Sequence, residues 1–234
     1  EKSFKAITPK SAVGIGDDCA VLPYKNQDQL LVTTDLLTEG VHFLKDKITP
    51  FELGHKSLAV NLSDIAAAGG KPLGAFLSIA LPTDTSIEWA NEFISGFRAL
   101  AKKYNCPLLG GDTTKSTRDL FINVCVLGTV NKNHVKSRSA AQAGDVICVT
   151  GPLGDSLAGL KIILDGEHVF DPEAARLLLD RHLLPEPHLK EGQWLSKMKG
   201  VHAMMDVSDG LASDLPHICE RSKVGAEVFP SQIP

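Results

Sequence analysis

The stretch NLSDIAAAGGKP, residues 61–72, decides how this chain folds. Small alanines followed by two glycines and a proline are typical of a helix that ends there. Upstream, Leu58, Leu62 and Ile65 recur at helical intervals and form one apolar face. The sequence therefore predicts a helix over residues 50–68 that buries this face.

A polar stripe with Asn61 and Asp64 follows the edge of that apolar face. One interpretation is that the helix carries a carboxylate and an amide into a packed environment. A lone buried carboxylate is costly, so Asp64 would then need a partner. The other interpretation is a solvated polar edge, and the helix alone does not decide between them.

The composition is that of an ordinary globular protein: 234 residues, 43% hydrophobic and 22% charged, with a formal net charge of -4. This length suits one large domain or two smaller ones. Basic residues are dispersed, so we expect no nucleic-acid surface and no membrane-binding patch. The apolar runs are strand-sized, and residues 1–5 show no signal-peptide pattern. Five scattered cysteines without a Cys-x-x-Cys pair indicate a reducing, cytoplasmic compartment.

Aspartates recur in five places, each at a strand end, a glycine turn or a helix edge. They are Asp17 with Asp18, Asp35, Asp64, Asp112, and Asp206 with Asp209. Carboxylates without clustered cysteine or histidine suit hard divalent cations, above all Mg²⁺. Several Mg²⁺ ions beside glycine turns suit a polyphosphate ligand and phosphoryl transfer. Each aspartate taken alone could also be a turn or capping residue.

Further elements follow from apolar runs and helix signals. Strands are expected at residues 30–34, 74–81, 107–109, 121–130, 146–150, 203–206 and 225–229. A capping box at Thr85 and Glu88 predicts a helix up to Tyr104. Residues 151–159 are expected to lead into a helix, another helix is expected from residue 171, and a third carries residues 211–218 and could be capped by Ser208. Gly110 and Gly111 predict a tight turn against a phosphate.

Six motifs, in the same order along nearly the whole chain, resemble the thiamine-monophosphate kinase family. They are residues 16–20, 33–43, 61–64, 110–113, 150–156 and 206–211. The family belongs to the superfamily named for aminoimidazole ribonucleotide synthetase, and its members phosphorylate thiamine phosphate with ATP. The resemblance implies a mixed α/β fold: an N-terminal α/β domain, residues 1–143, whose strands form a β-barrel across a homodimer, and a C-terminal α/β domain, residues 144–234.

The resemblance also implies site residues, matched position by position. The implied metal ligands for several Mg²⁺ ions are Asp18, Thr33, Thr34, Asp35, Asp64, Asp112, Asp206 and Asp209. The implied nucleotide contacts for ATP are Gly111, Asp112, Arg138 and Ser208, and His42 would contact thiamine phosphate. Asp64, Asp35 and Asp112 are the expected catalytic residues. From the residues alone, His42 and Arg138 could equally be structural or surface residues.

The chain departs from the family in one respect. A further Gly-Gly-Glu-Asp motif and a C-terminal aromatic residue, which help to bind thiamine in the family, have no counterpart here. We therefore expect the C-terminal domain and the substrate pocket to be incomplete in this chain. Two alternatives stay open: another ATP-using synthetase of the superfamily, for selenophosphate or a purine precursor, or a non-catalytic Mg²⁺-nucleotide scaffold.

Overall fold

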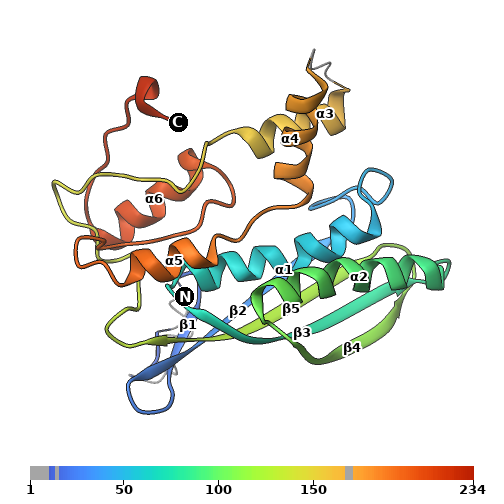
Figure 1. Ribbon diagram of the computed structural model, residues 1–234, viewed down its shortest axis with the longest axis horizontal. Helices are drawn as coiled ribbons and strands as arrows, with labels where there is room; N and C mark the ends of the chain where they lie inside the picture. The colour runs from blue at the N-terminus through green and yellow to red at the C-terminus, as the bar shows by residue number, and fades with distance from the viewer. Residues whose placement is uncertain (1–10, 14–15, 167–170) are drawn as a thin grey trace.

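The computed structural model describes residues 11–13, 16–166 and 171–234, and it has a mixed α/β fold (Figure 1). The expectation about residues 1–5 lies outside these ranges. The first half contains β1 (Ala20–Pro23), β2 (Asp28–Thr38), α1 (Pro50–Ala67), β3 (Lys71–Pro82), α2 (Ile87–Tyr104), β4 (Leu108–Ser116) and β5 (Phe121–Asn131). The second half contains α3 (Asp155–Asp165), α4 (Pro172–Leu183), α5 (Leu189–Ser196), α6 (Leu211–Ser222) and the short η1 (Pro230–Gln232).

The five strands form one sheet in the order β1-β2-β5-β3-β4. β2 and β5 pair antiparallel along their whole length, from Asp28 opposite Asn131 to Thr38 opposite Phe121. β3 and β4 are parallel and are connected by α2, because a parallel pair needs a long crossover. α1 and α2 lie on one face of this sheet (Figure 1).

Helix α1 begins and ends where the sequence predicts. The Thr49 hydroxyl accepts a hydrogen bond from the Glu52 N–H at 3.2 Å, and the Glu52 carboxylate accepts one from the Thr49 N–H at 2.8 Å. This capping box satisfies two N–H groups at the start of the helix. At the other end Gly69 takes a φ of +74°, a conformation that glycine adopts at low cost.

The predicted capping box of α2 is wrong by one residue. Ser86, and not Thr85, is the N-cap: its hydroxyl accepts from the Trp89 N–H at 3.1 Å. The helix consequently begins at Ile87, and Glu88 lies in the first turn without a reciprocal cap bond among the described contacts. The Ser86 hydroxyl reaches the N–H three residues on, as N-cap geometry requires.

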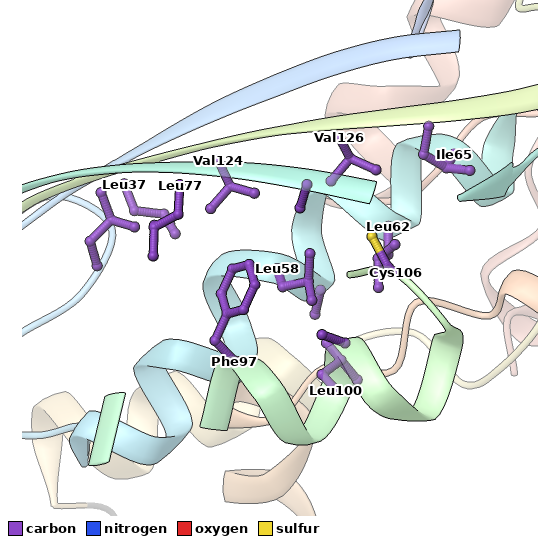
Figure 2. Packing of buried hydrophobic residues seen from close by; sticks show 14 of the residues in the cluster. Leu37, Leu58, Leu62, Ile65, Leu77, Phe97, Leu100, Cys106, Val124 and Val126 are labelled. Carbon is purple, nitrogen blue, oxygen red and sulfur yellow. The ribbon is translucent and has the colours of Figure 1, made fainter. Parts of the chain in front are cut away.

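The core lies between the sheet and the two helices (Figure 2). Leu58, Leu62 and Ile65 of α1 are fully buried, as their spacing predicts. They meet Val124 and Val126 of β5, which are also buried. Ser57 and Asn61 of the polar stripe are fully buried as well. The solvated-edge interpretation of this helix is therefore wrong, and its polar stripe lies in a packed environment.

The other face of the sheet carries no helix in the described structure (Figure 1). Alternate residues of the strands point toward it, among them Leu36 and Phe76, which are 54% and 38% exposed. Every residue of β4 except Ser116 is exposed. An apolar open face and an exposed edge strand are features that proteins usually cover.

The second half differs from the expectation. Residues 146–150, 203–206 and 225–229 form no strand within the described ranges, although each has a strand-like composition. A strand is stable only when a neighbour satisfies its N–H and C=O groups, and these segments pair with no described neighbour. Helices α3, α4 and α6 form where helices are expected, whereas α5 was not expected. No helix in the described residues is long and apolar enough to cross a membrane.

Candidate functional site

Three of the predicted aspartates, Asp18, Asp64 and Asp206, meet at one place. Each offers a carboxylate oxygen, and these oxygens all lie within 4.8 Å of one another. Asp18 lies two residues before β1, Asp64 projects from α1, and Asp206 lies in the loop before α6. Residues far apart in the sequence thus form one acidic cluster, and we use this name for these three residues.

Asp64 is held in the cluster by its neighbours. The Thr33 hydroxyl of β2 donates a hydrogen bond to its carboxylate, and the Cys19 thiol donates one to its carbonyl at 3.4 Å. The pKa of Asp64 is raised to about 8, first by burial and next by the negative charge of Asp206. Asp35 and Asp18 add to this repulsion, which shows that Asp35 is electrostatically close.

Asp206 is in a similar environment. Burial and then the charge of Asp18 raise its pKa to about 7, while a hydrogen bond from Ser63 and the charge of Arg138 oppose this change. Two carboxyl groups with such raised pKa values are short of positive charge. A cation at the centre of the cluster would relieve this deficit.

The cluster fits a small divalent cation. Its donors are carboxylate and hydroxyl oxygens, the atoms that Mg²⁺ prefers. Oxygens on opposite sides of a bound Mg²⁺ lie roughly 4 Å apart, close to the separations in the cluster. The Thr33 hydroxyl bonded to Asp64 could serve as a further ligand or orient the carboxylate.

The predicted ligands Thr34 and Asp112 lie elsewhere. Thr34 alternates with Thr33 along β2, so its side chain is on the open face, where its hydroxyl accepts from Asn123 Nδ2 at 2.9 Å. Asp112 pairs with Ser78, and Ser78 with Asn123, which puts the Asp112 side chain on that same open face. Three strand spacings, roughly 14 Å, separate β4 from β2.

The predicted turn at Gly110 and Gly111 is instead part of strand β4. Gly111 has a φ of +151°, and an added Cβ would lie 1.7 Å from the Leu77 carbonyl oxygen. Gly111 therefore allows the backbones of β3 and β4 to approach closely. The prediction of a turn is wrong because glycine is required here for the close approach of two strands and not for a change of chain direction.

Gly111 and Asp112 also line a cleft on the helix side of the sheet, where Asp112 contributes its backbone because its side chain is on the open face. The cleft has a volume of about 440 Å³ and lies between β3, β4 and α2. Its walls are largely apolar, with Trp89 and Phe93 stacked at a centroid separation of 5.6 Å. No member of the acidic cluster lines it. A cleft of this size and character suits a flat heterocyclic ring.

His42 lies in the turn after β2 and is exposed. Its Nδ1 accepts a hydrogen bond from the Thr38 N–H at 3.0 Å, so this nitrogen holds the turn and the other ring nitrogen is left for a ligand. The charge of His42 lowers the pKa of Asp35, although burial raises it more. His42 is therefore close to the predicted catalytic Asp35.

Ser208 and Asp209 are exposed in the loop before α6. The predicted Ser208 cap of α6 is wrong: Gly210 is the N-cap, without a side-chain bond. Buried Asp214 instead accepts from the Ser208 and Asp209 N–H groups at 2.9 and 3.0 Å. Sequence reasoning missed Asp214, although an acid in the first turn of a helix is a signal for such a role.

Comparison with known proteins identifies the family of the chain. Family models described as AIR synthase related protein, N-terminal and C-terminal domain, match residues 16–130 and 142–234. The thiamine-monophosphate kinase of Buchnera aphidicola is 41% identical over 94% of this chain and 67% of its own length. That of Bacillus subtilis is 38% identical over 98% of this chain and 72% of its own length.

The chain belongs to the thiamine-monophosphate kinase family. Its fold agrees with solved members. The structure described as AaThiL complexed with AMPPCP and TMP has a TM-score of 0.85 and 36% identity, covering 95% of this chain and 68% of that one. Thiamine-monophosphate kinase from Stenotrophomonas maltophilia K279a has a TM-score of 0.77 and 38% identity, covering 94% of this chain and 70% of its own. The predictions of a mixed α/β fold and of a kinase are thereby confirmed.

Proposed function

We propose that this chain transfers the terminal phosphoryl group of ATP to thiamine phosphate and so forms thiamine diphosphate. Relatives at about 40% identity carry the name of this activity, and one solved neighbour is described with AMPPCP and TMP. The observation in this molecule that carries the proposal is the acidic cluster of Asp18, Asp64 and Asp206. A transfer between two polyanions needs such a place for cations.

We assign the divalent cations, Mg²⁺ by chemistry, to the acidic cluster, with Thr33 and Asp35 beside it. Bound there, Mg²⁺ would neutralise phosphate charge during the transfer. Asp64 is the central residue in this assignment because α1 fixes its backbone and Thr33 fixes its carboxylate. The metal roles of Thr34, Asp112 and Asp209 stay predictions, as do the nucleotide role of Ser208 and the substrate role of His42.

The transfer is proposed to be direct and in line, without a phosphoenzyme. The attacking group is a phosphate oxygen that is ionised at neutral pH, so it needs no strong general base. The chain's residues then have two tasks, to position the two phosphates and to lower their repulsion. Asp64 and its neighbours serve the second task, and His42, beside Asp35, is suited to the first.

The nucleotide base is proposed to bind in the cleft between α2 and β4. Trp89 and Phe93 offer an aromatic wall, and Gly111 lines the cleft with its backbone. Arg138 contacts Asp18 of the acidic cluster, so its guanidinium is in a position suited to a phosphate.

A symmetric homodimer is proposed from the open face of the sheet. Leu36, Phe76 and Phe121 are exposed there, and β4 offers an unpaired edge. A second copy packed on this face would bury these side chains and could close the strands into a barrel. Asp112 lies on the same face, so the dimer would also bury or complete its site.

One turnover assay tests the proposal. The protein is incubated with Mg²⁺-ATP and thiamine phosphate, and thiamine diphosphate and ADP are separated by chromatography. Equal formation of both products supports the kinase. ADP formed with selenide or a purine precursor, and none with thiamine phosphate, would assign the chain to another branch of the superfamily. No turnover with any substrate, despite nucleotide binding, would favour a scaffold.

A further inference from the structure

Arg138 compensates the acidic cluster in the structure. Its Nη2 lies 2.7 Å from Asp18 Oδ1, and its Nε lies 3.3 Å from Asp18 Oδ2. The side chains of Arg138 and Asp18 are 19% and 3% exposed. The guanidinium thus engages both oxygens of a carboxylate that also belongs to the cluster, in a shielded environment where such a pair is strong.

The backbone of Arg138 is fixed without the help of its side chain. Its N–H donates to Asp17 Oδ1 at 2.7 Å, and its carbonyl accepts from the Ser222 hydroxyl at 2.7 Å. The Ser222 oxygen also accepts from the Ala141 N–H at 3.0 Å. Ser222, at the end of α6, therefore holds both ends of the turn that carries Arg138. The guanidinium can leave Asp18 while the turn stays in place.

A divalent cation and Arg138 compete for the same atoms. The guanidinium pairs with Asp18, whereas a cation at the centre would contact Asp18, Asp64 and Asp206 together. The cation also brings twice the charge to a cluster that is short of positive charge. A cation bound to Asp18 would repel the guanidinium and draw charge from the same two oxygens, which favours loss or lengthening of at least one of the two bonds to Arg138.

We propose that Arg138 is an exchangeable counter-ion: its guanidinium pairs with Asp18 and leaves it when a divalent cation binds. The proposal rests on the metal site assigned under the proposed function. It adds an order of events, because the released guanidinium becomes free to meet a nucleotide phosphate only after the cation has arrived. Ser222 has a positioning role, since it keeps the turn in place during the exchange.

Calorimetric titration with Mn²⁺, without nucleotide, tests the exchange in the wild type, Arg138→Lys and Arg138→Ala. Arg138→Ala should bind Mn²⁺ about tenfold more tightly, the scale of one charge-assisted hydrogen bond. Arg138→Lys keeps the charge but loses the two-pronged contact, so its affinity should lie between the other two. Arg118→Ala is the matched control, because Arg118 pairs with neighbouring Asp119 at the surface and is 86% exposed. It should bind as the wild type does.

Two results would overturn the exchange. Equal or weaker Mn²⁺ binding by Arg138→Ala would mean that the guanidinium supports the bound ion. Arg138→Lys with wild-type affinity would mean that long-range charge alone matters. Circular dichroism confirms that each variant is folded before titration. Because no kinase assay enters, a failure here is distinct from a failure of the proposed substrate.

The unmodified protein offers a second measurement. The Nε–H of Arg138 donates to Asp18, so its exchange with water should be slow before Mg²⁺ is added. Nuclear magnetic resonance of ¹⁵N-labelled protein should show this exchange accelerate as Mg²⁺ saturates the site. A signal that stays protected at saturating Mg²⁺ would show that Arg138 does not leave.

Discussion

The Thr33 hydroxyl of β2 donates a hydrogen bond to the carboxylate of Asp64 on α1. This contact joins the sheet to the helix at the point where three carboxylates meet. Burial, and next the charge of Asp206, raise the pKa of Asp64 to about 8, so an ionised Asp64 is costly there without a neighbouring cation. The following predictions depend on this site and on its surroundings.

Asp64→Asn should reduce kcat by a factor on the order of a hundred or more, comparable to the loss of a major electrostatic contact. The shape is kept while one charge of the metal site is lost. In EDTA the same variant should be more stable than the wild type, with Tm higher by roughly 2–4 °C for each ~1 kcal/mol of ionisation cost that is relieved. This gain should be larger at pH 9 than at pH 6, since the raised pKa lets Asp64 be neutral at the lower pH.

Steady-state kinetics and thermal unfolding check this pair of effects. Asp180→Asn in α4 is the control: the Asp180 side chain is half exposed and makes a long surface ion pair with Arg176, 3.9 Å, so the change should alter neither by much. An Asp64→Asn enzyme with a near-normal rate at limiting Mg²⁺ would show the interpretation of the acidic cluster to be wrong.

His42→Ala should raise KM for thiamine phosphate and leave kcat within a few-fold, because His42 is exposed and its proposed role is to hold substrate. Initial rates at varied thiamine phosphate and saturating ATP measure this. A loss that falls on kcat alone, or a phosphohistidine trapped after acid quench, would instead give His42 a chemical role.

Gly111→Ala should destabilise the protein by at least ~1–3 kcal/mol and weaken ATP binding. The new Cβ would come 1.7 Å from the Leu77 carbonyl oxygen, so β3 and β4 would have to separate at the floor of the cleft. Gly110→Ala is a matched control, because its Cβ would lie 3.4 Å from the Phe76 ring. Urea unfolding and ATP titration of both variants test this; similar behaviour of the two would contradict it.

His182→Gln should change how stability depends on pH. Burial, and next the charge of Lys56, lowers the pKa of His182 from 6.5 to about 4. As pH falls from 6.5 toward 4, the unfolded chain binds this proton first, so the wild type loses stability. The variant lacks this loss, and its free energy of unfolding relative to wild type should rise as pH falls from 7 to 4. An offset that is constant across this range would refute the assigned pKa.

The proposed homodimer predicts a particle of about twice the chain's mass in solution, because the open sheet face is apolar. Multi-angle light scattering at micromolar concentration measures this. Phe76→Lys, in the middle of that face, should give monomers, whereas Lys25→Glu in the turn between β1 and β2 should not. A monodisperse wild-type monomer would remove the argument for a barrel across two chains.

The cytoplasmic localisation expected from the cysteine pattern stays a prediction.

Most of the N-terminal half could be predicted from sequence because its signals are local, although β1 and the full length of β4 were missed. The spacing of Leu58, Leu62 and Ile65 fixes the buried face of α1, and the strands read as apolar runs. The second half could not, because residues 146–150 have a strand's composition but no described neighbour to pair with. The prediction for Gly111 is wrong for a related reason. Its φ of +151° allows close contact with the backbone of Leu77, which is 34 positions away in sequence.

The candidate site was predictable in its parts but not in its assembly. Asp18, Asp64 and Asp206 each stood out beside a strand end or on a helix, yet spacing does not show that they meet while Asp112 lies on the other face of the sheet. Asp214 and Ser222 were missed because their roles depend on backbone groups of distant loops. Such contacts depend on tertiary structure and leave no periodic pattern.

Anomalous X-ray scattering from Mn²⁺ tests the central claim most directly. Crystals of the protein with Mn²⁺, AMPPCP and thiamine phosphate are measured above the manganese absorption edge. We predict at least one peak bonded to carboxylate oxygens of Asp18, Asp64 and Asp206, and its loss from Asp64→Asn crystals grown in the same way. Manganese bound elsewhere, with the three carboxylates free of metal, would contradict the account.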